Sequence, residues 1–516
     1  MLMSEKTYDA VVIGAGNGGL SAAAYLAKEG KRVLVLEKNN LPGGCATSFR
    51  RGRFEFEATL HELCQMGDGP EPGAVRQLLD DYGLDVDWVP INESFSSVNR
   101  DPVNGFDVFM PDGVQAFIDA MEKAVPGSRE SMTSVMELAR MCGDGVKWLA
   151  GYHNEPEGLA KAEMLMRYHD LMKVVPVSTD DMLRRLGVPD KAREIFESYW
   201  DYVSADSTQM SFAVYSFMTY TYLSQKPWIA RKRSHEISLA FDRRIREMGG
   251  DIWYRSEVKR IDIDKGQAKG VELADGRYIP CPWIISNLMP HVVYGRMVEP
   301  SEVPLREKKL MNARIMGQSC FTIYLGLDAS AQEIGLKGYD TFVRTTGDTH
   351  QQFENASSLE THKDYCVTVL SNAIQDASEK GTCLLQFSKF FTSDVFKDVS
   401  IKDYFKLKDK IALDTIKDYE KLSGCDIRNH IEEVVVATPE TWARYIGTPQ
   451  GDVYGYVPVS WDGMFARVTA GHKIDHAIRG LRFCGGHGTQ MDGYSQAYLS
   501  GAEQARYTLL DMKEAR

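Results

Sequence analysis

The residues most clearly suited to binding a charged ligand are the glycines between Gly14 and Gly19. Gly14, Gly16 and Gly19 fit the spacing G-x-G-x-x-G. In that spacing the first glycine makes a tight turn, the second lets the backbone approach a pyrophosphate, and the third allows close helix packing. Glu37 follows about 20 residues later, where a carboxylate accepts hydrogen bonds from both ribose hydroxyls and disfavours a 2′-phosphate. Together these residues predict a dinucleotide site.

The sequence on either side of this turn predicts the strands and the helix that position it. Residues 8–13 form a short β-branched apolar run, which predicts a strand buried on both faces of a parallel sheet. Residues 20–29 predict a helix whose N-terminal N–H groups face the anion, and residues 33–36 predict the next strand. The segment is therefore expected to be a Rossmann-type βαβ unit.

A pair of glycines after Glu37 limits which cofactor is expected. Gly43 and Gly44 stand directly after the acid and again permit close backbone approach to a phosphate or ribityl chain. Here the chain resembles the FAD-dependent superfamily of amine oxidases, carotenoid desaturases, carotenoid isomerases and retinol saturases, in which a Gly-Gly pair follows the ribose-binding Glu. The resemblance implies FAD as the cofactor.

The resemblance extends along nearly the whole chain and is most specific at residues 8–64, 234–290 and 436–506. It implies a mixed α/β (α+β) fold, in which a Rossmann-type FAD-binding domain is discontinuous in sequence and carries an inserted α+β substrate domain. The FAD-binding parts are expected at residues 1–89, 227–290 and 471–516, and the substrate-domain parts at 90–226 and 291–470. The residues that it implies for FAD binding are Gly14, Gly16, Asn17, Gly18, Gly19, Glu37, Lys38, Gly43, Gly44, Cys45, Ala46, Val258, Asn287, Gly485, Gly486 and Asp492.

Within the first substrate-domain segment the periodicity from Pro90 onward predicts helices with short loops. The expected helices are 113–123, 130–153, 158–174, 178–186 and 191–203. The stretch 210–223 is dense in aromatic and sulfur side chains, which either line a long apolar pocket or belong to the core. In the second segment, residues 320–327, 365–370 and 383–390 predict strands, and 401–422 predicts a charged amphipathic helix.

Composition excludes several classes of protein. The chain has 516 residues and a formal net charge of −12, which argues against nucleic acid as a partner. Its nine cysteines show no C-x-x-C spacing and are expected to be reduced thiols rather than disulfides or zinc ligands. Neither a signal-type leader nor an apolar run long enough to span a membrane is visible, so the expected location is cytoplasmic.

The resemblance implies an FAD-dependent enzyme acting on a carbon–carbon double bond of a long apolar substrate such as a carotenoid or retinoid. Cys45 and Ala46 follow the second Gly-Gly, where many desaturases have Arg, which disfavours simple desaturation. Saturase, desaturase and isomerase all remain open, with an external electron partner. The alternatives are isomerisation or reduction of an unsaturated fatty acid or enone, oxidation of an amine, and a non-catalytic isoprenoid-binding protein of the GDP-dissociation-inhibitor type.

Candidate acid–base residues follow a strand that in relatives passes the flavin. A carbon–carbon double bond has no proton to give, so its reduction or isomerisation needs a donor nearby. We assign this role to His61, Glu62 and Cys64, with Asp492 and Tyr494 in the turn after His487 as further candidates. The alternative is that His61 caps a strand and that Cys64 is a core residue.

Four side chains are candidates for contact with substrate: Tyr220, Tyr222, Lys232 and Arg233. The two cations stand where many relatives have glycines, just before Ser234. Pointing inward they would bind an anion, either reduced flavin or a carboxylate, and pointing outward they would be a solvated basic surface. With Trp228, Ile229 and Arg231 they could also make a peripheral membrane contact.

Overall fold

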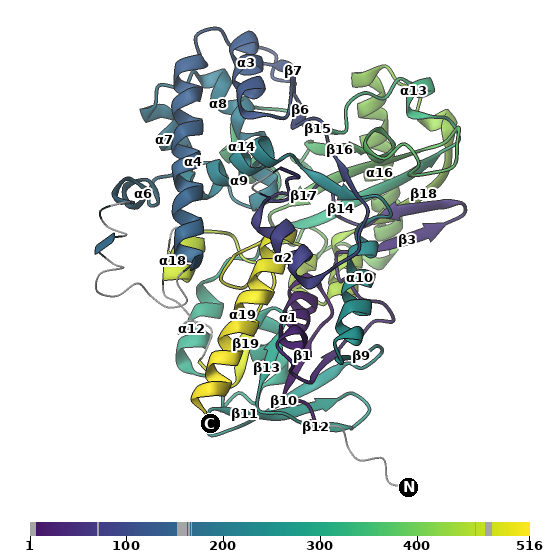
Figure 1. Ribbon diagram of the computed structural model, residues 1–516. Helices are drawn as coiled ribbons and strands as arrows, with labels where there is room; N and C mark the ends of the chain where they lie inside the picture. Colours follow the sequence, from purple (N-terminus) through teal and green to yellow (C-terminus); the bar gives the residue numbers. More distant parts are fainter. Residues whose placement is uncertain are drawn as a thin grey trace.

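The computed structural model describes residues 7–69, 72–151, 162–163, 166, 168–459, 461–469 and 477–515 (Figure 1). Two large sheets dominate it. One is built around the predicted glycine turn, and the other belongs to the predicted substrate domain. None of the described helices is both long and apolar enough to cross a membrane.

A five-stranded parallel sheet with the order β19-β13-β1-β2-β9 holds the glycine turn. Its strands come from three distant parts of the chain: β1 (Ala10–Ile13), β2 (Val33–Leu36), β9 (Asp251–Trp253), β13 (Ile284–Ser286) and β19 (Leu481–Phe483). β1 and β2 match the strands predicted at residues 8–13 and 33–36. The mixed α/β fold class with a Rossmann-type unit is thereby confirmed.

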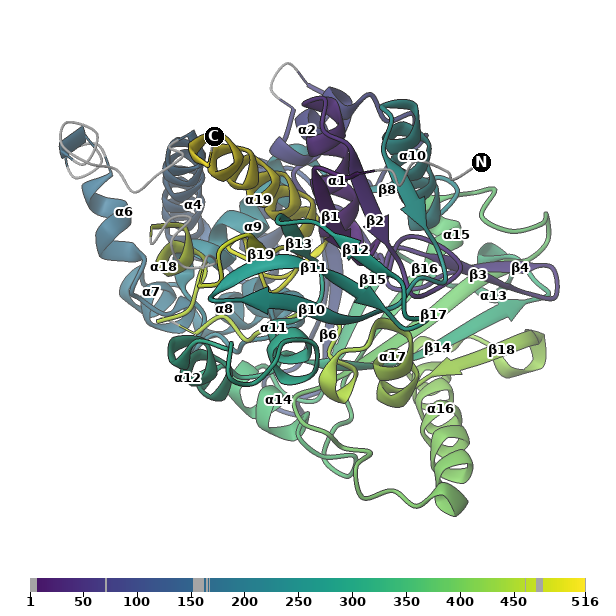
Figure 2. The ribbon, with the colours of Figure 1, turned by 90° about the horizontal axis from the view of Figure 1, so that it is seen from below.

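The two faces of this sheet are covered differently, as Figure 2 shows. Ala10 and Val12 pack into the same core as helices α1 (Asn17–Lys28), α10 (Ser234–Glu247) and α19 (Tyr494–Glu514). Val11 and Ile13 pack against the antiparallel strands β10 (Val258–Asp264), β11 (Gln267–Leu273) and β12 (Tyr278–Pro280). Both faces are apolar, which explains why β1 is a continuous apolar run and not an alternating one.

The second sheet has seven strands in the order β18-β14-β17-β16-β15-β6-β7. Its members are β6 (Phe95–Asn99), β7 (Phe106–Met110), β14 (Ser319–Leu327), β15 (Asp340–Arg344), β16 (Tyr365–Val369), β17 (Cys383–Phe391) and β18 (Ile431–Ala437). The predicted strands near 320, 365 and 383 are confirmed. On one face a separate core cluster contains Ala412 and Ile416 of α16 (Ile401–Ser423), the predicted amphipathic helix.

The prediction of helices throughout residues 90–226 is wrong at its start, because β6 and β7 lie there. β6 alternates buried and half-buried residues, as a strand should, but two of its buried positions are Ser97 and Asn99. Because these two buried residues are polar, the sequence of β6 does not show the alternation of apolar and polar residues that predicts a strand. Parallel pairing of β6 with β15 joins this segment to the later half of the chain, so one sheet contains residues from both predicted substrate segments.

Helices follow these strands and form one wall of the molecule (Figure 1). They are α3 (Val114–Ala124), α4 (Arg129–Gly151), α6 (His169–Val174), α7 (Thr179–Arg185), α8 (Asp190–Phe196), the 3-10 helix η1 (Glu197–Val203) and α9 (Phe212–Gln225). The predicted helix 191–203 is therefore two elements. Much of the predicted helix 158–174, and the end of 130–153, lie outside the described residues.

Shorter elements connect these parts. The hairpin β3 (Ser48–Arg51) and β4 (Phe54–Glu57) precedes His61, α2 (Ala74–Tyr82) follows it, and β5 (Trp88–Pro90) pairs with β8 (Trp228–Ala230). The remaining elements are α11 (Pro290–Val292), the π-helix η2 (Val293–Met297), α12 (Leu305–Ala313), α13 (Ala331–Ile334), α14 (Thr349–Asn355), α15 (Leu370–Ala373), η3 (Arg428–His430), α17 (Pro439–Ile446), η4 (Pro449–Gly451) and α18 (Met464–Thr469).

Candidate active site

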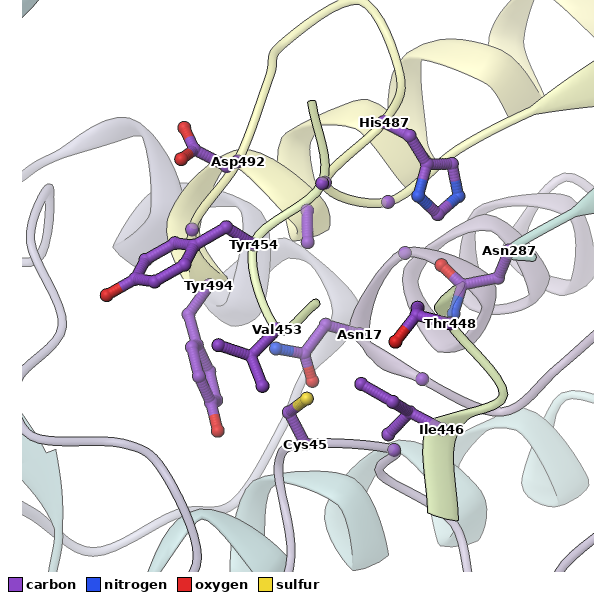
Figure 3. A pocket seen from close by; sticks show the side chains of 18 of the residues that line it. Asn17, Cys45, Asn287, Ile446, Thr448, Val453, Tyr454, His487, Asp492 and Tyr494 are labelled. Carbon is purple, nitrogen blue, oxygen red and sulfur yellow. The ribbon is translucent and has the colours of Figure 1, made fainter. Parts of the chain in front are cut away.

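A cavity of about 780 Å³ extends from the carboxyl ends of the parallel strands to helix α9. Side chains from well-separated segments surround it, among them Asn17, Cys45, Asn287 and Tyr494 (Figure 3). Ligands of open parallel sheets bind at the carboxyl ends of the strands, so the position of the cavity fits a dinucleotide site. Fourteen of the sixteen predicted cofactor residues line this cavity.

The glycine turn is as tight as its sequence requires. Gly14 has a φ of +91°, and α1 begins at Asn17 with Gly16 as its N-cap. A Cβ on Gly18 would lie 2.6 Å from the backbone nitrogen of Gly485, and a Cβ on Gly501 would lie 2.1 Å from the carbonyl oxygen of Gly18. The turn therefore contacts the last segment of the chain directly, and only glycines permit that approach.

Glu37 is held in place at the end of β2. Its carboxylate accepts hydrogen bonds from the backbone N–H groups of Ala15 and Asn39, each at 2.8 Å. The residue is 5% exposed and lines the cavity beside Lys38 and Val258. Because one carboxylate oxygen contacts the glycine turn itself, Glu37 fixes the turn as well as facing the ligand space.

The second glycine pair lies against the first. The N–H of Gly43 donates to the carbonyl of Ala15 at 2.7 Å, and Gly43 and Gly44 have φ angles of +120° and +60°. Gly485 and Gly486 close the opposite side of the cavity, where Gly485 has a φ of +95°. Residues 14–18, 43–45 and 485–486 thus border one continuous space.

Two predicted cofactor residues, Gly19 and Ala46, do not line the cavity. Gly19 lies behind the turn, where a Cβ would come within 2.0 Å of the carbonyl oxygen of Gly14. Ala46 is fully buried, and its carbonyl accepts a hydrogen bond from Ser238 Oγ at 2.7 Å. Both residues support the shape of the site from behind. The remaining predicted cofactor residues line it: Gly14, Gly16, Asn17, Gly18, Glu37, Lys38, Gly43, Gly44, Cys45, Val258, Asn287, Gly485, Gly486 and Asp492.

All five predicted acid–base residues line the same cavity: His61, Glu62, Cys64, Asp492 and Tyr494. Burial raises the pKa of Glu62 well above its usual range, and the negative charge of Asp340 adds to the shift. Among the described residues, neither carboxyl oxygen of Glu62 makes a hydrogen bond of good geometry, although the nearby Tyr199 hydroxyl partly offsets the rise in pKa. The surroundings of Glu62 therefore favour its neutral, protonated form.

Cys64 and Tyr494 are also protonated. Burial raises the pKa of the Cys64 thiol, which donates to Ser495 Oγ at 3.3 Å. Burial raises the pKa of Tyr494 well above its usual range, and its hydroxyl is paired with Thr59 Oγ1 at 2.5 Å. These two groups make hydrogen bonds inside the protein, whereas Glu62 makes none of good geometry to a described residue.

Several residues at this end of the cavity carried no recognisable signal in the sequence. Tyr202, Asp340, Thr368 and Gln386 all lie around the ring of His61, although they are 141 to 325 residues away from His61 in the chain. The buried Asp452 also lines the cavity, and burial raises its pKa to about 7. These residues sit on ordinary strands, a 3-10 helix and a loop, so no local spacing could have grouped them.

Comparison with known proteins adds to this geometry. Residues 12–82 match the family model of an NAD(P)-binding Rossmann-like domain. The chain is 25% identical over 479 residues to the all-trans-retinol 13,14-reductase of Danio rerio, covering 87% of this chain and 77% of that one. It is 27% identical to the rat protein of that name, of which the match covers 59%. It is 25% identical over 467 residues to the chloroplastic prolycopene isomerase of Daucus carota, covering 88% and 72%.

Solved structures agree on the fold. An oxidoreductase from Methanosarcina mazei has a TM-score of 0.65 at 17% identity, covering 95% of this chain and 98% of that one. Cyclohexylamine oxidase from Brevibacterium oxydans has a TM-score of 0.59 at 15% identity, covering 99% and 100%. In sequence the chain is similar to all-trans-retinol 13,14-reductases and prolycopene isomerases, and in fold it is similar to cyclohexylamine oxidase. It is therefore an enzyme, and the hypothesis of a non-catalytic isoprenoid-binding protein is not supported.

Helix α9 forms the apolar wall of the site. Val214, Phe217, Met218 and Tyr222 line the cavity, at the spacing of one helical face. Tyr220 does not line it, which corrects the prediction that both tyrosines contact substrate. Two residues apart on a helix point about 200° away from each other, so Tyr220 and Tyr222 cannot share one face. Met210, Phe212 and Tyr215 belong to the core.

Lys232 and Arg233 do not line the cavity either, which corrects their prediction as substrate contacts. The Arg233 guanidinium is buried, but it donates to the backbone carbonyls of Glu55, Arg231 and Ala377. Lys232 is exposed. Arg233 thus follows neither of the two predicted alternatives. It points inward, yet it ties together three backbone segments, one of them strand β4, and does not line the cavity.

The predicted membrane-contacting stretch is not an exposed surface. Trp228 and Ile229 are 6% and 0% exposed within β8. Arg231 forms ion pairs with Asp87 at 2.7 Å and with Asp376 at 2.9 Å. The two apolar side chains of this stretch are therefore buried and Arg231 is paired, whereas Lys232 is exposed, so the peripheral membrane contact stays a prediction.

Asp492 predicts a specific pH dependence of stability. Burial raises the pKa of its carboxyl to about 7, whereas an unfolded Asp titrates near 4. The native state thus binds the extra proton between about pH 4 and pH 7, and the stability that this proton provides is lost as the pH rises through that range. We expect Asp492→Asn, which stays neutral, to reduce the fall in melting temperature between pH 5 and pH 8. Parallel curves for both proteins would contradict this assignment.

Proposed function

We propose that this protein is an FAD-dependent oxidoreductase that adds, removes or rearranges hydrogen at a carbon–carbon double bond of a long, uncharged polyene. The observation that carries the proposal is that one cavity joins the glycine cradle and Glu37 to an apolar wall and a set of buried acid–base groups. The relatives are named for reduction of a retinoid and isomerisation of a carotenoid, which are both reactions of conjugated double bonds.

The residues fit FAD in several respects. Glu37 would hold the adenosine ribose, and the N-terminus of α1 with Gly16 and Gly18 would hold the pyrophosphate, because a Cβ at either glycine would enter the turn. Asn17 Oδ1 is buried without a partner at the start of α1. The segment from Gly485 to Tyr494 would border the flavin end. Bound FAD supplies the capacity to accept or donate a hydride.

The charges along the cavity support an uncharged substrate. Its described cationic lining residues are Lys38, Lys259 and Arg296. Lys38 follows Glu37, Lys259 follows Val258, and Arg296 belongs to the π-helix that contacts β10, so all three lie at the nucleotide end. Around α9 the described titratable residues are acids, tyrosines, a histidine and cysteines. A substrate carboxylate there would find no described cation and would meet the negative charge of Asp340.

The acid–base residues support proton transfer at the far end of this cavity. Glu62 can donate the proton that burial keeps on it, and His61 can accept or return one beside it. α9 excludes water from this end with Val214, Phe217 and Met218. The same groups would serve saturation, desaturation or redox-neutral isomerisation. Electrons for net reduction would come from an external partner.

The test begins with the purified protein, which should be yellow and should release FAD on denaturation. The flavin is then reduced without oxygen and mixed with carotenoids, retinoids, unsaturated fatty acids, enones and amines. We expect polyenes to reoxidise the flavin or to be isomerised. Colourless protein, or turnover of amines alone, would overturn the proposal.

The charge argument gives a separate prediction about substrate selectivity. For a matched pair of retinoids, a carboxylic acid and its methyl ester, we expect half-saturation by the acid to require at least about tenfold more ligand, because the unpaired charge loses at least ~1.4 kcal/mol of binding. Steady-state turnover of both compounds at neutral pH measures this ratio. Equal half-saturation, or a preference for the acid, would return a fatty-acid or other acidic substrate to consideration.

A further inference from the structure

The ring of His61 lies in a hydrogen-bonded network that extends behind the cavity. Thr368 Oγ1 is 3.2 Å and the Tyr202 hydroxyl 3.5 Å from His61 Nδ1. Gln386 Nε2 is 3.2 Å from His61 Nε2 on the other side of the ring. Both ring nitrogens therefore have partners, and the partners differ on the two sides.

Asp340 lies beneath the Nδ1 side of the ring and is completely buried. One of its oxygens accepts a hydrogen bond from Tyr202 at 2.5 Å, and the other accepts one from Thr368 at 2.8 Å. Each hydroxyl has one proton, and each donates it to the carboxylate. The oxygens of Tyr202 and Thr368 can then only accept from His61.

This arrangement determines which ring nitrogen carries the proton. An unprotonated Nδ1 would face the lone pairs of two hydroxyls and, at 3.6 Å, the carboxylate of Asp340. A protonated Nδ1 satisfies those acceptors instead. Nε2 of the neutral ring is then the acceptor, which agrees with the amide of Gln386 that donates to it.

We propose that Asp340 is a positioning residue that, through Tyr202 and Thr368, holds His61 as the Nδ1–H tautomer, with Nε2 presented to the cavity as a proton acceptor. The use of this acceptor in turnover rests on the proposed function, but the tautomer does not. His61 and Gln386 line the cavity, whereas Asp340 does not. Asp340 would act on the reaction through the ring, and its charge would stabilise the imidazolium that forms when Nε2 takes a proton.

The division of roles between the two neighbouring acids follows from their surroundings. Asp340 accepts hydrogen bonds on both oxygens, as a carboxylate does, whereas among the described residues neither oxygen of Glu62 makes a hydrogen bond of good geometry. The anion of Asp340 in turn favours the neutral form of Glu62. Asp340 thus positions the base His61, while Glu62 remains a proton donor. Two acids whose surroundings shift their pKa values apart in this way can serve different functions in one site.

The tautomer can be measured directly. Protein labelled with ¹⁵N in its histidine rings, studied by NMR at about pH 8, where an ordinary histidine is neutral, reports the proton on each ring nitrogen. His61→Gln identifies the signal of His61. We expect Nδ1–H in the wild type. A proton on Nε2 overturns the proposal, whatever the enzyme proves to act on.

Asp340→Asn tests the positioning role. The new amide would donate to one hydroxyl, which frees that hydroxyl to donate to Nδ1 and permits the other tautomer. We expect the His61 signal to shift toward Nε2–H and kcat to fall at least about tenfold, with KM and flavin content within about twofold of wild type.

Asp364→Asn is the matched control. Asp364 is equally buried, lies next to β16 in the same sheet, and accepts hydrogen bonds from the backbone and side chain of Thr345, with no contact to His61. The Asp364→Asn substitution should leave the tautomer of His61 and the ratio of kcat to KM unchanged. If Asp364→Asn alters the His61 signal as Asp340→Asn does, or if Asp340→Asn keeps Nδ1–H and full kcat, the proposal fails.

Discussion

Gly16→Val is expected to yield protein without bound flavin. A Cβ on Gly16 would lie 2.4 Å from Asn287 Nδ2, and the branched side chain would fill the space in which the backbone must approach a pyrophosphate. The ratio of absorbance at flavin wavelengths to that of protein, measured after purification, gives the flavin content. We expect it to fall to near zero, the largest effect among the cofactor variants.

Two further variants make this result interpretable. Gly295→Ala changes a glycine of the π-helix near the cavity, where a Cβ would meet nothing within 4 Å, and should retain flavin. Glu37→Ala removes the acceptor for ribose and for the N–H groups of Ala15 and Asn39, and should weaken flavin binding by about 1.5–3 kcal/mol. If Gly16→Val and Glu37→Ala both purify with full flavin, the dinucleotide site lies elsewhere.

His61→Ala is expected to lower product formation at least about a hundredfold, because positioned acid–base groups contribute that much or more. Flavin content should be unchanged, since the contact that holds this segment is made by the His61 carbonyl, which accepts a hydrogen bond from the Tyr339 hydroxyl and survives the substitution. Rapid mixing of reduced enzyme with a polyene separates binding from product formation. We expect binding without product.

The control for this variant is His350→Ala. His350 is about half exposed, pairs with Asp206 at 3.4 Å, and does not line the cavity. Turnover should remain within about twofold of wild type. Unchanged turnover in His61→Ala would remove His61 from the mechanism and leave Glu62, Asp492 and Tyr494 as the candidates. Loss of flavin from His61→Ala would assign the residue to cofactor binding instead.

Much of the fold and of the cofactor site could be predicted from short stretches of sequence. The β1 turn, Glu37 and the pair Gly43 and Gly44 are close together in the chain, and their backbone requirements leave few residue choices. The apolar strands at 284–286 and 481–483 are recognisable for the same reason. Their burial on both faces of a parallel sheet demands continuous apolar runs.

Side-chain direction was predicted less well, since it depends on distant packing. Arg233 looked like a cation for a substrate, but the carbonyls of Glu55 and Ala377, which satisfy it, come from other parts of the chain. Tyr220 was grouped with Tyr222 by composition, whereas the helical phase of α9 separates them. β6 was missed because its buried serine and asparagine are tolerated only next to their partners across the molecule.

The sequence by itself determined that a dinucleotide turn exists, which acid faces it, and that His61 and Glu62 stand near it. Only the tertiary structure decided the hydrogen-bond partners and the favoured protonation states of those two residues. Pairing of β15, β16 and β17 brings Asp340, Thr368 and Gln386 together, and η1 adds Tyr202, so that His61 is surrounded by partners from four elements. Protonation states depend on charges and hydrogen bonds within a few ångströms, and residues hundreds of positions apart reach that distance only when the chain folds.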